Sequence, residues 1–191
     1  MRLFVAVEID GRVLARVSDL SAELQRRASE QAPAARITWV PPARMHLTVR
    51  FIGEAEATQA AVIRAALTPR LTTAAFDLRI GGTGAFPARG APRVIWTGIE
   101  GGLDHLHQLE REVTARLTPC GVAPGDREYR PHLSLARVRD AGGLRARALL
   151  AGLDGTLGTT RIDAITLFQS RLSPKGPTYV ALQQTPLASR T

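Results

Sequence analysis

Cysteine, lysine and aromatic residues are all scarce in this chain of 191 residues. The single cysteine, Cys120, excludes an intrachain disulfide and is typical of a protein from a reducing compartment. No apolar run approaches the roughly 18 residues that a membrane-spanning helix needs. The first strand-like segment meets Glu8 and Asp10 too early for a signal peptide. We therefore expect a soluble, cytoplasmic protein that does not contact a membrane.

Nearly all of the positive charge is carried by arginine. The chain has 25 basic and 17 acidic residues, a net charge of +8, and Lys175 is its one lysine. A guanidinium offers paired donors that match two phosphate oxygens, so the composition permits a polyanionic partner. A biased genomic base composition would give the same excess, and both explanations stay open. The cations are dispersed along the chain, which argues against a basic tail that grips long nucleic acid.

The hydrophobic pattern predicts a mixed α+β fold. Adjacent strands are too frequent for the strict alternation of a doubly wound sheet, and the chain has no linker long enough to separate two independent domains. The glycine-rich segment from Gly81 to Pro87 is predicted to be a loop. Residues 1–191 are therefore expected to form a single domain. Its predicted strands are 2–9, 37–40, 45–52, 76–80, 94–99, 133–138, 162–170 and 178–183, and its predicted helices are 13–28, 57–67, 103–117 and 144–151.

Two short signatures carry the chemistry: His46-Leu47-Thr48 and His132-Leu133-Ser134. On a strand, residues i and i+2 point to the same face, so each signature presents an imidazole and a hydroxyl together over an apolar back. One such triplet is most often an ordinary histidine at a sheet edge. Two copies, in the two halves of a chain with four histidines, favour a shared site between two similar lobes.

Paired imidazoles and hydroxyls suit the hydrolysis of a strained cyclic phosphodiester. A neutral imidazole can take a proton from water while a protonated one donates to the leaving ribose oxygen, and both forms are accessible near neutral pH. The hydroxyls can donate to the phosphoryl oxygens in the transition state. This scheme requires no metal or other cofactor. His105 and His107 lie two residues apart on a predicted helix, so they diverge by roughly 200° and cannot chelate one metal together.

The two signatures and their flanks resemble the 2H phosphoesterase superfamily, and in particular the RNA 2′,3′-cyclic phosphodiesterase family once named 2′-5′ RNA ligase. The resemblance covers nearly the whole chain. It is carried by residues 2–6, 39–41, 46–53, 86–87, 92–96, 131–137 and 167–170, with Leu172, Gly176 and Tyr179 near the end. It implies a bilobal α+β fold in which two pseudo-symmetric lobes, with antiparallel sheets, surround a central cleft and carry helices outside.

The resemblance also implies a role for each residue of the two signatures. His46 would be the general acid that protonates the departing 3′ oxygen, and His132 the general base that activates water, which leaves a 2′-phosphate. Thr48 and Ser134 would hold the phosphate. Ser134 departs from the threonine that is more frequent in the family. It keeps the hydroxyl but lacks the β-methyl that restricts the rotamer.

Four residues outside the signatures need separate treatment. Arg137 matches the family's arginine after the second motif and would add a contact to the phosphate. Phe51 matches an aromatic residue that stacks on the terminal base, although period two alone turns its side chain toward the core. Arg50 shares the site-facing parity of His46, and Arg130 lies beside the second signature. Contact with RNA phosphates and solvent exposure at the rim stay open for both.

The resemblance implies that the partner is RNA with a 2′,3′-cyclic phosphate end, including tRNA fragments, or a free cyclic nucleotide, and we expect a monomeric enzyme. Two alternatives remain. One is a 2′-5′ RNA ligase that joins tRNA halves by related chemistry. The other is a non-catalytic, arginine-rich module that binds RNA ends. Turnover distinguishes both hydrolysis and ligation from mere binding, and product analysis separates the first two.

Overall fold

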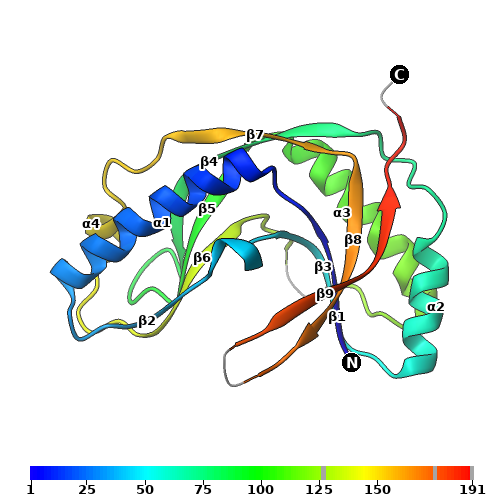
Figure 1. The fold of residues 1–191 in the computed structure, drawn as a ribbon, viewed down its shortest axis with the longest axis horizontal. Coiled ribbons are helices and arrows are strands. Elements are labelled where there is room, and N and C mark those ends of the chain that lie inside the picture. The colour runs from blue at the N-terminus through cyan, green and yellow to red at the C-terminus, as the bar shows by residue number, and fades with distance from the viewer. Residues whose placement is uncertain (126–127, 174–175, 190–191) are drawn as a thin grey trace.

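The computed structural model of the protein describes residues 1–125, 128–173 and 176–189. Its strands form two antiparallel sheets, which we call sheet A and sheet B, and they lie side by side in the molecule (Figure 1). Sheet A has the strand order β3 (Leu47–Glu54), β1 (Arg2–Val7), β8 (Ala164–Arg171) and β9 (Thr178–Pro186). Sheet B has the order β2 (Arg36–Trp39), β6 (Leu133–Asp140), β5 (Val94–Gly101), β4 (Phe76–Phe86) and β7 (Thr156–Ile162).

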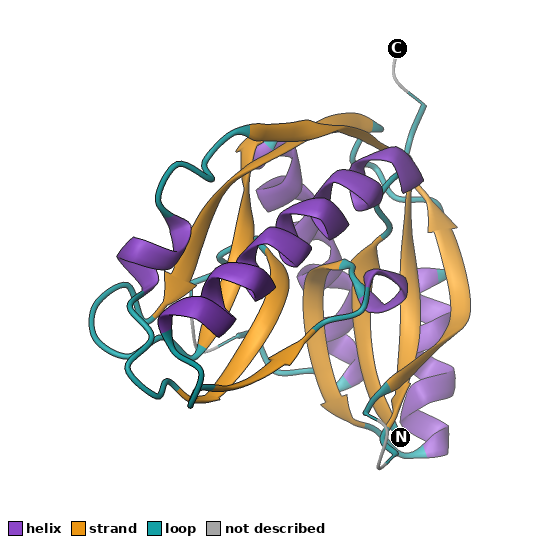
Figure 2. Ribbon diagram, turned by 60° about the vertical axis from the view of Figure 1, so that its left-hand side comes forward, coloured by secondary structure: helices purple, strands orange, loops and turns teal. Residues whose placement is uncertain are grey.

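In the part of the chain that the structure describes, four α-helices accompany the sheets, and Figure 2 distinguishes helices from strands by colour. The long helix α1 (Gly11–Gln31) begins where the Asp10 carboxylate accepts the amide hydrogen of Arg12 at 2.8 Å, which is an N-terminal cap. Its apolar stripe packs on β7 and on α4 (Ala146–Leu150). Helices α2 (Ala57–Leu67) and α3 (Leu103–Leu117) contact each other, and α3 packs on β3. Each sheet is therefore covered by helices on one face.

The alternation of side chains separates the two faces of each sheet. In β1, Leu3, Val5 and Val7 join the large buried apolar cluster that also contains the helices' apolar residues. Phe4 and Ala6 point the other way and form a small separate cluster with Phe168. We call the face opposite the helices the inner face of each sheet. The large cluster is continuous between the two sheets, which holds the two lobes together.

The predicted α+β class with antiparallel sheets and outer helices is confirmed. One strand was missed. Residues 162–170 were predicted as a single strand, whereas β7 ends at Ile162 and β8 begins at Ala164, with Asp163 between them. Most of β7 precedes the predicted range and carries few large apolar residues, so its sequence has no clear strand pattern.

The predicted loop from Gly81 to Pro87 is wrong, because β4 continues to Phe86. The glycines serve the packing between strands. A Cβ atom on Gly81 would meet the Glu100 carboxyl at 2.5 Å, and one on Gly84 would meet the Trp96 indole at 2.1 Å. Glycine is needed at Gly84 because the Trp96 ring of β5 lies across the backbone of β4, which is a known reason for glycine within a strand.

The described residues also include two short 3₁₀ helices. The first, η1 (Pro42–Arg44), leads from β2 in sheet B to β3 in sheet A. The second, η2 (Thr118–Cys120), follows α3 and holds Cys120 half-buried. No helix within the described ranges is long and apolar enough to cross a membrane. The connection through η1 matters most, because it delivers the first signature from one sheet to the other.

Candidate active site

The two predicted histidines occupy equivalent places in the two sheets. Each stands one residue before its strand, His46 before β3 and His132 before β6. The Nδ1 atom of His46 lies 2.9 Å from the carbonyl oxygen of Arg44, and Nδ1 of His132 lies 2.7 Å from that of Arg130. A carbonyl oxygen only accepts, so Nδ1 must carry the proton in both rings. Nε2 is therefore the atom of each ring that is left to exchange a proton.

His46 is packed among aromatic rings of the inner face of sheet A. It stacks on Phe4 with ring centroids 4.7 Å apart and an interplanar angle of 29°, and the ring of Tyr179 meets it edge-on at 4.9 Å. Phe168 lies 6.2 Å away on the same face. This burial lowers the pKa of His46 below its ordinary value, and the hydrogen bond to the Arg44 carbonyl opposes that effect only in part.

His132 has an aromatic wall of its own on the inner face of sheet B. Phe86 meets it edge-on at 5.1 Å, and Trp96 lies 6.3 Å away. Trp96 in turn lies across Gly84, where no larger residue would fit. Burial again lowers the pKa of the imidazole, the Arg130 carbonyl raises it, and the positive charge of Arg137 lowers it further. Both histidines are therefore easier to deprotonate than an exposed histidine.

The two hydroxyl residues follow their histidines into the strands. Thr48 pairs with Ala6 across sheet A, and Ser134 pairs with Trp96 across sheet B, so both lie on the inner faces. Both residues are half-buried. In each sheet the hydroxyl thus shares its face with the aromatic wall of the neighbouring histidine.

Hydrogen bonds join the segments that carry the signatures. Tyr129, three residues before His132, donates from its phenol to the backbone carbonyl of Thr48 at 3.0 Å. On the other side, the amide of Val40 donates to the carbonyl of Leu135 at 2.8 Å, just before the chain turns through η1 toward His46. The structure therefore brings the two predicted signatures to adjoining ends of the two sheets.

β-Bulges decide which further residues face the site. In β3 the register with β1 skips Val49 and then Ile52, and in β6 the register with β5 skips Leu135. Each extra residue reverses the alternation beyond it. As a result Phe51 pairs with Phe4, and Arg137 is exposed opposite Val94, both on the inner faces.

Phe51 and Arg137 are equivalent positions, since each lies five residues after its histidine. Phe51 is 68% exposed, and its ring lies 6.4 Å from that of Phe4. Strict alternation of side chains along the strand predicted that Phe51 points toward the core. That expectation is wrong because of the bulge. The same geometry brings Arg137 within electrostatic range of His132. One inner face thus presents an aromatic ring at this position, and the other presents a cation.

The expectation that Arg50 shares the site-facing parity of His46 is wrong for the same reason. Arg50 pairs with Val5, whose side chain enters the core, and its own side chain is only 10% exposed. It forms an ion pair with Glu110 of α3 at 3.7 Å and donates to the carbonyl of Ala123. Arg130 is exposed and forms an ion pair with Glu128 at 2.9 Å.

The remaining histidines do not form a metal site. His105 is exposed and stacks on Phe76, and His107 lies edge-on to Tyr129 at 5.8 Å. Within the described ranges, no three histidine, cysteine or acidic side chains are grouped so that they could hold a metal ion.

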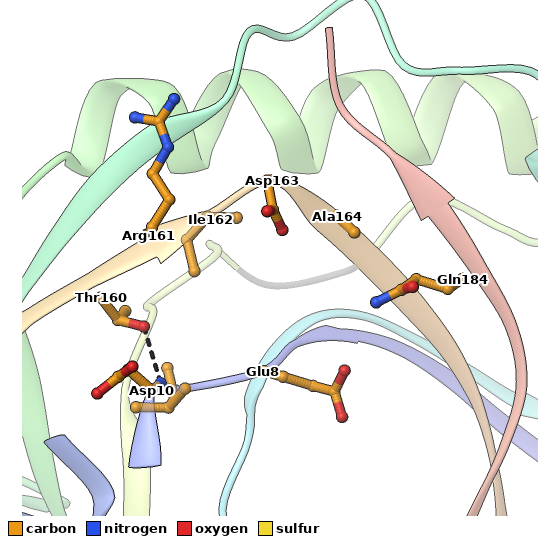
Figure 3. A pocket seen from close by; sticks show the side chains of 9 residues that line it. Glu8, Asp10, Thr160, Arg161, Ile162, Asp163, Ala164 and Gln184 are labelled. Atoms are coloured by element: carbon orange, nitrogen blue, oxygen red, sulfur yellow. Dashed lines mark hydrogen bonds between the residues drawn. The ribbon is translucent and has the colours of Figure 1, made fainter. Parts of the chain in front are cut away.

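A surface hollow of about 250 Å³ lies beyond the end of β1, and it contains none of the predicted site residues (Figure 3). Three carboxylates line it, those of Glu8, Asp10 and Asp163. The backbone amide of Asp10 donates to the hydroxyl of Thr160, and Arg161 is paired with Asp77. An acidic lining repels a phosphate group, so this hollow is a poor place for a phosphodiester.

The fold and the paired signatures define a 2H phosphoesterase. In a comparison of structures, the crystal structure of TT0787 from Thermus thermophilus matches the whole chain over its own whole length, with a TM-score of 0.75 and 28% identity. The chain belongs to the 2′-5′ RNA ligase superfamily, whose family model matches residues 10–173 and so includes both signatures.

Two curated relatives are similar over most of their lengths, and both carry the name RNA 2′,3′-cyclic phosphodiesterase. The protein from Aeropyrum pernix is 37% identical over 146 residues, which are 75% of this chain and 82% of that protein. The protein from Archaeoglobus fulgidus is 32% identical over 185 residues, which are 96% of this chain and 98% of that protein.

Proposed function

We propose that this protein hydrolyses 2′,3′-cyclic phosphate ends of RNA to 2′-phosphate ends without a metal ion. The observation that carries the proposal is the equivalence of His46 and His132, each with Nδ1 tied to a backbone carbonyl two residues earlier. The names of the curated relatives support the same reaction. The proposal extends to tRNA fragments and to free cyclic nucleotides as substrates, and to a monomeric cytoplasmic enzyme in which residues 1–191 act as one domain.

In the proposed mechanism the two Nε2 atoms exchange protons with the reacting oxygens. Nε2 of His132 takes a proton from water as the water oxygen attacks phosphorus. The bond between phosphorus and the 3′ oxygen breaks, and protonated His46 donates its Nε2 proton to that oxygen. The products are a free 3′ hydroxyl and a 2′-phosphate. Each lobe supplies one of the two histidines, so neither lobe is expected to be active alone.

The phosphate would be held by Thr48, Ser134 and Arg137. The two hydroxyls donate to the non-bridging oxygens, and the guanidinium adds a charge-assisted contact where negative charge builds up. Ser134 retains more rotamer freedom than a threonine would, so its contact is expected to be less preorganised. Phe51 would stack on the terminal base, for which its exposure on the inner face of sheet A is suitable.

The test is hydrolysis of 2′,3′-cyclic AMP in EDTA, with the 2′ and 3′ product isomers separated. We expect wild-type turnover to the 2′ isomer and a loss of at least about a hundredfold in kcat for either His46→Ala or His132→Ala. His105→Ala is the matched control, because that imidazole stacks on Phe76 away from both signatures. Full activity in either of the first two variants, or activity that EDTA abolishes, would refute the mechanism.

Ligation is the second candidate, and the observation that favours it is the match to the 2′-5′ RNA ligase superfamily. Joining an RNA with a 2′,3′-cyclic end to one with a free 5′ hydroxyl requires the same two proton transfers with a ribose hydroxyl in place of water. Incubation of paired tRNA halves, with analysis of the linkage formed, tests it. Binding of both halves with neither hydrolysis nor joining would instead support the non-catalytic alternative.

A further inference from the structure

The inner face of sheet B continues beyond the proposed phosphate site as a strip of arginines. Ile37 and Trp39 of β2 pack on the core, so Arg36 and Thr38 lie on the opposite, inner face. In β6, Val138 is buried, whereas its neighbours Arg137 and Arg139 are exposed. We call Arg36, Arg137 and Arg139 the arginine strip.

The pairing of β2 with β6 places the members of this strip side by side. Thr38 pairs with Arg137 and Arg36 pairs with Asp140, while the register skips Arg139. The two residues of such a bulge share one partner, so Arg139 and Asp140 both lie opposite Arg36. The strip therefore begins beside His132 and Ser134 and extends along β6 to the far end of β2.

The guanidiniums of the strip are available to a ligand. Between described residues, ion pairs with carboxylates hold eight other arginines, among them Arg26, Arg50 and Arg116. None of the ion pairs between described residues involves Arg36, Arg137 or Arg139. Asp140 is the acidic neighbour on this strip, and its carboxylate accepts the backbone amide of Gly142 at 3.0 Å.

The spacing fits successive phosphates of a single strand. Residues two apart on a regular strand lie about 7 Å apart along its axis, so Arg137 and Arg139, with the bulge at Arg139, are at most about one such step apart. Proteins often bind a nucleic acid backbone, independently of its sequence, through a row of arginine side chains that contact successive phosphates. The row of arginines that leads away from the proposed phosphate site has this arrangement. The opposite inner face, with Phe4 and Phe51, is aromatic and suits a base rather than a phosphate.

We propose that Arg36 and Arg139 form a subsite for the phosphates of the nucleotides that precede the cyclic end. The enzyme then prefers an oligoribonucleotide to a cyclic mononucleotide, because only the longer substrate reaches the strip. This inference rests on the proposed function and specifies its substrate: the terminal nucleotide lies between the signatures, and the rest of the strand follows β6 toward β2. The contacts are electrostatic, so the preference is independent of sequence and weakens with salt.

The experiment compares 2′,3′-cyclic AMP with a five-nucleotide RNA that ends in 2′,3′-cyclic AMP. For the double variant Arg36→Gln/Arg139→Gln we expect kcat/KM to fall on the order of tenfold with the RNA, and to change less than about twofold with the mononucleotide. The slope of log kcat/KM against log salt for the RNA should become shallower by about 1.4, since each single-strand phosphate contact contributes about 0.7. The charge-retaining variant Arg36→Lys/Arg139→Lys should restore most of that slope.

Arg111→Gln is the matched control, because Arg111 is an exposed arginine on α3 and lies away from the strip. This variant should leave kcat/KM for both substrates, and its dependence on salt, unchanged. An equal fall in kcat/KM for both substrates in the double glutamine variant, or no fall for either, would overturn the subsite.

Failure of the proposed function is distinguishable from failure of the subsite. If the wild-type protein hydrolyses neither substrate, the proposed function fails, and binding decides the subsite. The probe is then the same five-nucleotide RNA with a 2′-phosphate end and a fluorescent label, measured by anisotropy. A Kd raised on the order of tenfold in the double glutamine variant supports the strip, and an unchanged Kd refutes it.

Discussion

The phenol of Tyr129 donates to the backbone carbonyl of Thr48 at 3.0 Å, which joins the segment before β6 directly to β3. The phenol is half-buried, and its partial burial together with the negative charge of Glu110 raises its pKa well above its ordinary value. Tyr129 therefore stays a donor across the whole working pH range. The contact fixes the distance between the strands that follow the two histidines.

Removal of that phenol should cost both stability and rate. Tyr129→Phe leaves a half-buried carbonyl without its donor, so we expect the free energy of unfolding to drop by about 1–2 kcal/mol in urea titrations. The kcat should fall several-fold while KM changes little, because the two histidines are no longer held at a fixed separation. Tyr179→Phe is the control for stability, since the Tyr179 phenol makes no hydrogen bond within the described part of the chain. Equal losses in the free energy of unfolding for the two substitutions would contradict this role of Tyr129.

The pKa values of the two histidines predict an acid-shifted pH profile. In the free enzyme one imidazole must be protonated and the other neutral, so kcat/KM should be bell-shaped. Burial lowers both pKa values, so the falling limb should begin below the ordinary histidine value of 6.5. A falling limb above that value would contradict the expectation. A bound phosphate should raise both pKa values again through its negative charge, which would move the kcat profile toward neutral pH.

Arg137 should contribute to the lowered pKa of His132, after the larger effect of burial. Its positive charge disfavours the imidazolium, so Arg137→Gln should raise the pKa of His132 and move the rising limb of the profile to higher pH. Titration of the His132 ring signals by NMR measures this shift independently of turnover. Arg130→Gln is the control, because that guanidinium pairs with Glu128 and the substitution keeps the carbonyl that anchors His132. An unshifted His132 in the first variant would show that Arg137 acts on the substrate alone.

Gly84 should prove intolerant of any side chain. A Cβ atom there would meet the Trp96 indole at 2.1 Å, so Gly84→Ala must displace the ring that stands beside His132. We expect a loss of stability of about 1–3 kcal/mol and a lower kcat. Gly155→Ala has open space around its Cβ and should be close to neutral. Thermal unfolding and turnover of the two variants test this, and equivalent behaviour would refute the packing argument.

Arg50 should matter for folding and not for substrate. Its side chain is nearly buried beside Glu110, and loss of one partner leaves a buried charge unpaired. Arg50→Gln should therefore lower the free energy of unfolding by about 2–4 kcal/mol, with kcat/KM of the folded protein unchanged. Glu110→Gln should act in the same direction. Additive losses in the double variant would mean that the pair is not coupled.

The signatures and most elements were predictable because they depend on local pattern. The helix predicted for 57–67 matches α2, and the strands that follow His46 and His132 begin within two residues of their predicted starts. Those features rest on apolar periodicity and on residue type. The pairing of the two signatures across two sheets was inferred from their repetition and from the family resemblance.

The faces of individual residues beyond the signatures were not predictable from periodicity. Strict alternation placed Arg50 at the site and Phe51 in the core, and one extra residue at Val49 reversed both. A bulge depends on how a strand pairs with its neighbour, which a single strand does not record. The same limit applies to β4, where glycines that normally mark a loop accept side chains from β5.

Because of the bulge at Leu135, Arg137 lies on the inner face although it is an odd number of residues after His132. Insertion of one residue between Ser134 and Arg137, with the bulge kept at one extra residue, would leave the histidine and the hydroxyl in place but move every residue downstream to the opposite face of the sheet. Arg137 and Arg139 would then enter the core, and Val138 would face the substrate. Substrate preference in such a sheet can therefore change through the insertion of a single residue, without any substitution in the reacting pair.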